Sequence, residues 1–183
     1  MKKYSPVTQV VAIGIGAALF FLLARFVAIP TPIPNTSITF QYALLAVLVV
    51  LFGPVAGAIA GFVGHLLADA TGYGVWISWE IATAVFALVL GVFVLRNGLH
   101  EGEFNGKTIA RFSIGVIVGH LVAWLAVAPL LDILIYSEPA DKVFVQGAFA
   151  FAVNSVLTII FGIVVLLAYA KSRTKTGSLE ADA

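Results

Sequence analysis

The side chains that could do chemistry are few in this sequence, and most of them interrupt long apolar segments. His65 and Asp69 are four residues apart, so a helix would place them on one face. His120 and Trp124 have the same spacing. Polar groups inside apolar membrane helices are costly, and they usually face a cavity or one another. Both pairs are therefore candidates for a buried polar site.

Further polar and aromatic residues are expected at a similar depth. At a rise of about 1.5 Å per residue, Trp79 and Glu80 fall at the mouth of their apolar segment. Asn154 lies on a stripe of helical spacing that begins at Gly147 and continues to Thr158. The complete set of candidate ligand-binding residues is Trp79, Glu80, His120, Trp124, Asn154, Asp69, His65, Tyr73, Gln41 and Gln146.

Aromatic rings with a few hydrogen-bonding groups are what a pocket for a flat, polar heterocycle needs. A plainer interpretation also stands: tryptophans gather at membrane interfaces, and His65 with Asp69 can be a structural pair. Two ligands are too few for a dedicated metal site, and the chain has no cysteine. Residues 102–108 end like a phosphate-binding loop, but three residues separate the glycines where the motif needs four. We expect a binding protein without catalytic residues, metal or cofactor, and not an enzyme.

The elements that position these groups must be membrane helices. Hydrophobic residues make up 61% of the 183-residue chain and charged residues only 10%, whereas a soluble domain has about a quarter of its residues charged. About 20 apolar residues span a bilayer as a helix. We predict an all-α integral membrane domain over residues 1–170, with six transmembrane helices at roughly 7–29, 38–52, 54–71, 78–95, 108–128 and 144–170. A polar cytoplasmic tail follows from 171 to 183.

Proline, glycine and polar residues mark the connections. Prolines at 30, 32 and 34 end the first helix and begin a stiff, extended loop. Gly53-Pro54 is the turn between the second and third spans, and residues 129–142 form a polar connection before the last. The first apolar run is also compatible with a signal peptide, but Phe26-Val27-Ala28 is not a small-x-small cleavage site. We expect it to stay as a helix.

Basic residues predict the orientation. With the N-terminus inside, the cytoplasmic segments hold the lysines and arginines at 2, 3, 96, 107, 111, 171, 173 and 175. The other side keeps Lys142, with Arg25 near the outer end of the first span. The positive-inside rule therefore places both termini in the cytoplasm. The polar groups then lie in the outer half of the membrane, above inner halves that are almost apolar, which favours a dead-end pocket open to the outside over a pore.

Small residues spaced four apart predict helix contacts, because lipid gives no hydrophobic drive for helices to associate. The third span has two such rows, Gly53-Gly57-Gly61 and Ala56-Ala60-Gly64-Ala68, so we place it centrally. The fifth span carries Gly115-Gly119-Ala123. The first span carries the pairs Ala12–Gly16 and Gly14–Ala18 in its cytoplasmic half, where a partner protein competes with packing inside the bundle.

The order of these features resembles the substrate-binding S component of energy-coupling factor (ECF) transporters, the bacterial vitamin importers. The similar stretches cover nearly the whole chain, and they are 11–19, 33–36, 52–57 running on to 64–65, 76–79 and 169–175. The resemblance implies a six-helix small-molecule binder in the bacterial plasma membrane. In that family it docks on a transmembrane coupling (T) component driven by two ATP-binding cassette ATPases. The family's first helix contacts the T component through an Ala-xxx-Ala motif, and the matching positions here are either Ala12 and Gly16 or Gly14 and Ala18.

Within that family the chain looks most like members assigned to hydroxymethylpyrimidine, a thiamine precursor; riboflavin and pyridoxine-like rings are the alternatives. Glu80 or Asp69 could accept a hydrogen bond from an exocyclic amine of a pyrimidine, whereas riboflavin would need more stacking area. A rival from another class is a small proton-coupled carrier or channel that uses Asp69, Glu80 and His65. It would need polar residues through the whole membrane thickness, and the inner halves lack them. No nucleic-acid partner is expected.

Overall fold

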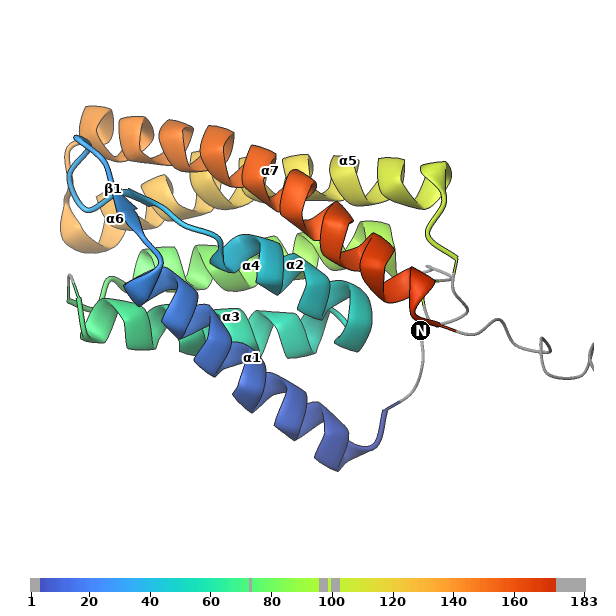
Figure 1. Cartoon of the computed structure of the whole chain (residues 1–183). Helices are drawn as coiled ribbons and strands as arrows, with labels where there is room; N and C mark the ends of the chain where they lie inside the picture. Colours follow the sequence, from blue (N-terminus) through green and yellow to red (C-terminus); the bar gives the residue numbers. More distant parts are fainter. Residues whose placement is uncertain (1–3, 73, 96–98, 100–102, 174–183) are drawn as a thin grey trace, which may run out of the picture.

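The structure is a computed structural model that describes residues 4–72, 74–95, 99 and 103–173. The helices lie alongside one another in one bundle, with a small β-hairpin at one end (Figure 1). In chain order the elements are α1 (Pro6–Phe26), β1 (Ile29–Pro30), β2 (Ser37–Ile38), α2 (Gln41–Phe52), α3 (Pro54–Ala70), α4 (Ile77–Val94), α5 (Gly106–Val122), the π-helical turn η2 (Ala123–Val127), α6 (Ala128–Tyr136) and α7 (Ala140–Lys171).

Among the described residues, four helical runs are long and apolar enough to cross a membrane: Pro6–Phe26, Ile77–Val94, Gly106–Tyr136 and Ala140–Lys171. The third of these joins α5, η2 and α6 into a continuous run of 31 residues. The other two helices are shorter, with 12 residues in α2 and 17 in α3. The fold is therefore all-helical in its membrane part, as predicted, but α2 is too short for a full span and α3 is at the lower limit of about 17 residues.

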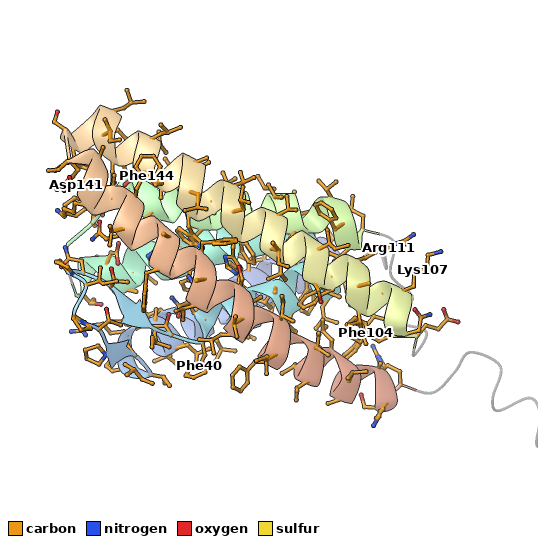
Figure 2. All side chains as sticks on the ribbon, turned by 90° about the horizontal axis from the view of Figure 1, so that it is seen from above. Phe40, Phe104, Lys107, Arg111, Asp141 and Phe144 are labelled. Carbon is orange, nitrogen blue, oxygen red and sulfur yellow. The ribbon has the colours of Figure 1, made fainter. Side chains whose placement is uncertain are left out.

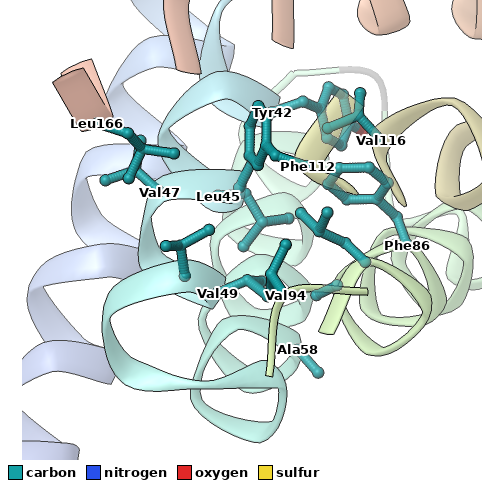
Figure 3. Packing of buried hydrophobic residues seen from close by; sticks show 14 of the residues in the cluster. Tyr42, Leu45, Val47, Val49, Ala58, Phe86, Val94, Phe112, Val116 and Leu166 are labelled. Carbon is teal, nitrogen blue, oxygen red and sulfur yellow. The ribbon is translucent and has the colours of Figure 1, made fainter. Parts of the chain in front are cut away.

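The centre of the bundle is the short helix α2, which packs against α1, α3, α4 and α7. Its Leu45 and Val49 are almost fully buried. Figure 3 shows them among apolar side chains from neighbouring helices, including Phe86 of α4 and Phe112 of α5. This apolar core extends along the bundle, from Ala58 and Val94 away from the hairpin to Tyr42 and Trp124 near it.

Small residues let the helices approach, as their spacing predicted. A Cβ at Gly61 of α3 would stand 2.8 Å from Leu45 Cδ2 of α2, and one at Gly64 would stand 2.7 Å from the carbonyl oxygen of Ala17 in α1. The two rows on α3 thus face different neighbours. Gly115 of α5 lies equally close to Phe93 of α4. α3 thus contacts α1, α2 and α4, as its two rows of small residues predicted, but the helix at the centre of the bundle is α2.

Four boundaries differ from the prediction by three residues or more. Residues 129–136 are not a polar connection: the fifth helix continues through η2 into α6, and α7 begins at Ala140. Proline normally ends a helix, but Pro129 follows a π-helical turn whose altered hydrogen bonding accommodates it. The first helix ends at Phe26, and the second begins at Gln41, because the chain between them pairs as strands.

The segment after α1 is extended, as its prolines predicted, but it folds back on itself. β1 and β2 are antiparallel, with Ile29 opposite Ile38 and Pro30 opposite Ser37. The turn is held by the Thr31 hydroxyl, which donates to the carbonyl oxygen of Thr36 at 2.6 Å. This hairpin, residues 29–38, covers one end of the bundle (Figure 1); we call that end the hairpin end.

Candidate ligand pocket

A cavity of about 160 Å³ opens at the hairpin end. Since a space of about 10–15 Å³ holds one water molecule, it has room for roughly ten water-sized groups. Three tryptophans, Trp76, Trp79 and Trp124, contribute to its lining and form what we call the aromatic wall. The hairpin contributes residues 35–37, and α7 contributes Gln146 and Asn154.

The aromatic wall is attached to one carboxylate, Asp132 of α6. Its Oδ1 accepts a hydrogen bond from Trp76 Nε1 at 2.8 Å and another from the Ser78 hydroxyl. Its Oδ2 accepts from Trp79 Nε1, also at 2.8 Å. Trp79 in turn stacks on Trp124, with ring centroids 5.6 Å apart and planes at 21°. Asp132 lies in the segment predicted to be a polar connection, and this role was not predicted from the sequence.

A second polar group lies where α2, α3 and α4 meet. The Thr83 hydroxyl donates to the carbonyl oxygen of Trp79 at 3.1 Å. Because a hydroxyl has one proton, His65 Nδ1 at 2.7 Å and the Tyr42 hydroxyl at 3.2 Å must donate to Thr83. His65 Nε2 then lies 3.7 Å from Asp69 Oδ1. Of these residues, Tyr42, His65 and Asp69 line the cavity.

Two predicted amides lie in the cavity wall with different roles. Gln146 donates from Nε2 to the carbonyl oxygen of Pro34 at 2.8 Å, so it ties α7 to the hairpin. Gln41 is 6% exposed, and its Oε1 has no hydrogen-bond donor within the described part of the chain. A buried acceptor without a donor costs about 1–3 kcal/mol. Gln41 lines the cavity, but Oε1 itself has almost no accessible surface, so a ligand N–H or O–H group would reach it only after the amide turns toward the cavity.

Glu80 and His120 are fully buried and do not line the cavity. Glu80 Oε1 accepts from the backbone N–H of Trp76 at 3.2 Å. His120 Nδ1 accepts from Trp124 Nε1 at 2.8 Å, and its Nε2 lies 3.1 Å from the Thr158 hydroxyl. Glu80 therefore holds the backbone at Trp76, and His120 holds the ring of Trp124. Tyr73, the remaining predicted residue, lies outside the described residues.

The predicted residues thus form two layers. Trp79, Trp124, Asn154, Asp69, His65, Gln41 and Gln146 come together around the cavity, and Glu80 and His120 are buried outside its lining. In the described part of the chain, no group of three or more His, Asp and Glu side chains is placed to hold a metal ion. The arrangement can bind and orient a flat polar molecule.

The comparisons with known proteins agree with this architecture. The sequence model of the ECF-type riboflavin transporter S component family matches residues 5–171. UPF0397 proteins from Lactobacillus johnsonii and Staphylococcus aureus strain Newman are 50% and 46% identical; each alignment covers at least 98% of both chains.

Two solved structures share the fold. The S component for biotin from an ECF-type ABC transporter superposes with a TM-score of 0.66 at 15% identity, over 94% of this chain and 95% of the other. The S component of a bacterial ECF transporter gives a TM-score of 0.62 at 22% identity, over 91% and 96%. Together with the apolar helices, these findings identify a multi-pass bacterial membrane protein. The chain belongs to the ECF-type riboflavin transporter S component family, the substrate-binding subunits of ECF transporters.

Proposed function

We propose that the chain captures a flat, hydrogen-bond-donating heterocycle at the outer face of the membrane for ATP-driven uptake. The observation that carries this proposal is the cavity at the hairpin end, whose lining combines the aromatic wall with the polar side chain of Gln41. Aromatic faces bind flat rings, and a few fixed polar groups orient them. Asp69 and Asn154 add a carboxyl and an amide to the lining.

The size of the cavity favours a single substituted ring. Hydroxymethylpyrimidine suits it, because its exocyclic amine can donate to Gln41 Oε1 or Asp69, and its ring can stack on an indole. Pyridoxine-like rings are of similar size. Riboflavin, with three fused rings and a ribityl chain, would require the hairpin or the tryptophans to move outward. Riboflavin stays an alternative, since the family description names it.

Charge at the two ends of the bundle supports the proposed orientation, with both termini in the cytoplasm. Lys107 and Arg111 lie at the end opposite the hairpin, and Asp141 lies at the hairpin end (Figure 2). Lys171 and Arg173 follow at the end of α7, away from the hairpin. The positive-inside rule would place this end in the cytoplasm and the cavity outside. The basic residues predicted at 2, 3, 96 and 175 lie outside the described residues.

In this proposal the chain works with a T component and two ATP-binding cassette ATPases, and α1 is the docking surface. The structure distinguishes the two small-residue pairs on α1. Gly16 is buried against Leu48 of α2 and Ala60 of α3, whereas Gly14 has no heavy atom of a neighbouring element within 4 Å and Ala18 is exposed. The outward pair Gly14–Ala18 is therefore the better candidate for close approach by a partner helix.

A proton-coupled carrier is supported less well. Asp69, Glu80 and His65 all lie near the hairpin end, and the described core beyond them consists of apolar side chains such as Val49, Leu90 and Phe112. A proton path would need polar groups there. Only a substantial rearrangement of the bundle would provide one.

The test is ligand identification followed by binding. The purified chain is analysed by mass spectrometry for a co-purified molecule, and hydroxymethylpyrimidine, pyridoxine and riboflavin are titrated into it. Asn154→Ala and Gln41→Met should each weaken binding of the preferred ring by up to about tenfold, since a hydrogen bond contributes about 0.5–1.5 kcal/mol. Ser155→Ala is the matched control on α7, because the Ser155 hydroxyl is buried, has no hydrogen-bond partner among the described residues and lies outside the cavity lining. Wild-type affinity in both cavity variants would place the ligand elsewhere.

A further inference from the structure

We infer that Asp132 is a positioning residue that sets the orientation of the aromatic wall and so the shape of the pocket. This inference rests on the proposed function in that the pocket it shapes is the one proposed to hold the ligand. Asp132 lines the cavity, but its carboxylate is occupied: Oδ1 accepts from Trp76 and Ser78, and Oδ2 accepts from Trp79. It therefore acts on a ligand through the tryptophans.

Three hydrogen-bond donors, from Trp76, Ser78 and Trp79, meet the buried carboxylate of Asp132, and we call this arrangement the clamp. Asp132 is 1% exposed, and a buried carboxylate is tolerated only when its oxygens are hydrogen-bonded. An indole has one donor and no acceptor, so each hydrogen bond fixes which way its ring faces. All three donors come from the four-residue segment 76–79, at the start of α4. The Asp132 side chain thus positions the start of α4.

The ring contacts beside the clamp depend on those orientations. Trp79 stacks on Trp124, and the ring of Trp76 lies 5.1 Å from that of Tyr136. The Tyr136 hydroxyl also accepts from the backbone N–H of Ile77 at 3.1 Å. Asp132 and Tyr136 are four apart on α6 and share a face. The α6 end of the run from Gly106 to Tyr136 therefore holds the tryptophan segment at two points.

The π-helical turn η2 brings Asp132 to this position. In an uninterrupted α-helix, Trp124 and Asp132 would be separated by about 80°, at about 100° per residue. A π-helical turn absorbs one extra residue, which reduces the difference to about 20°. The backbone N–H of Ala128 bonds to the carbonyl oxygen of Ala123, five residues back, as this geometry requires. Trp124 and Asp132 consequently face the same cavity.

The substitution Asp132→Asn tests the clamp with almost no change of shape. Asparagine keeps one acceptor oxygen but replaces the other with an NH₂ group, which cannot accept from an indole N–H. At least one tryptophan must lose its partner. Trp79→Phe removes one of the competing donors, so the double variant Asp132→Asn, Trp79→Phe should be damaged less than the two single changes predict together. Asp141→Asn is the matched control, an exposed aspartate at the same end that does not line the cavity.

Two readouts are needed. Near-ultraviolet circular dichroism and acrylamide quenching of tryptophan fluorescence, both on ligand-free protein, report the indole environment. Affinity for hydroxymethylpyrimidine and riboflavin reports the pocket. We expect Asp132→Asn to change the tryptophan spectrum, to increase quenching and to weaken binding of whichever probe the wild type takes by tenfold or more, with Asp141→Asn like wild type.

An unchanged tryptophan spectrum and unchanged quenching in folded Asp132→Asn would overturn the inference, and so would additive effects in the double variant. A wild-type protein that binds neither probe would count against the proposed substrates alone, because the ligand-free spectra still decide whether Asp132 orients the indoles.

Discussion

At the scale of single residues, the buried polar groups differ in whether the protein satisfies them. His120 uses both ring nitrogens within the bundle, on Trp124 and Thr158. Glu80 uses one oxygen on the backbone N–H of Trp76, and its Oε2 has no donor within the described residues. The carboxyl group of Asp69 interacts with Glu80 electrostatically. Glu80 therefore links the backbone at Trp76 to Asp69, a residue of the cavity lining. The Glu80 side chain itself does not line the cavity.

This geometry predicts opposite outcomes for two substitutions at Glu80. Glu80→Gln keeps an acceptor for Trp76 and gives the second position an NH₂ group that can donate to Asp69, so the thermal unfolding midpoint should stay the same or rise. Glu80→Ala leaves the Trp76 N–H buried without a partner, which costs about 1–3 kcal/mol, and should lower the midpoint by several degrees. Differential scanning fluorimetry in detergent measures both. A fall in Glu80→Gln as large as in Glu80→Ala would contradict the role given to Oε1.

At the scale of elements, apolar length and small-residue spacing were sufficient to predict the helices and several of their contacts. They could not predict η2, because a π-helical turn leaves no periodic signal in an apolar stretch, and Pro129 indicated an end where the helix continues. Asp132 was missed for the same reason: only the rotation at η2 turns it toward Trp124. The hairpin was also missed, since the prolines indicate extended chain but not its pairing with Ser37 and Ile38. The position of each polar residue along its helix predicted which of them would lie near one another. Which of them line the cavity depends on the rotation of each helix about its axis, and sequence spacing does not give that rotation.

The packing of α7 on η2 yields a prediction at the same scale. A Cβ added at Gly147 would collide with the carbonyl oxygen of Trp124. Gly147→Ala should therefore push α7 away from η2 and lower stability by about 1–3 kcal/mol, as overpacking typically does. It should also weaken ligand binding, because Gln146 and Asn154 move with α7. Gly106→Ala in α5 is the control. A Cβ at Gly106 would have no neighbouring heavy atom within 4 Å, so the thermal unfolding midpoint should be unchanged or slightly higher. Equal midpoints for the two variants would show that α7 can accommodate the extra methyl group.

At the scale of the whole molecule, polarity and charge are distributed along the bundle axis. The hairpin end holds the cavity, Asp69, Asp132 and the Glu138–Lys142 ion pair of 2.7 Å. The opposite end holds an apolar core and, at the helix termini, basic side chains (Figure 2). A chain with this asymmetry has one face suited to collecting a polar ring and another suited to the cytoplasmic surface. Residues at the two ends can therefore be labelled separately to determine how the chain is oriented in the membrane.

Because the chain has no cysteine, single-cysteine variants test the orientation without background. A membrane-impermeant maleimide should label Asp141→Cys in intact cells. It should label Glu103→Cys and Ser172→Cys only after the membrane is permeabilised, since these exposed positions lie at the basic end. Labelling of Glu103→Cys or Ser172→Cys in intact cells would reverse the topology, and with it the side from which the cavity opens.

Substitutions on α1 can separate an effect on docking from an effect on folding. Leucine at Gly14 meets open space in the isolated chain, so folding and probe binding should be like wild type, but a partner helix could no longer approach closely. Leucine at Gly16 instead meets Leu48, whose Cδ1 would stand 2.6 Å from the new Cβ, and should lower the unfolding midpoint. Co-purification of the T component and ATPases from cells that express all subunits measures docking, and scanning fluorimetry measures folding. Val92→Leu, on the exposed face of α4, controls for added bulk. If Gly14→Leu recovers the partners as fully as Val92→Leu does, the outward face of α1 is not where the coupling protein binds.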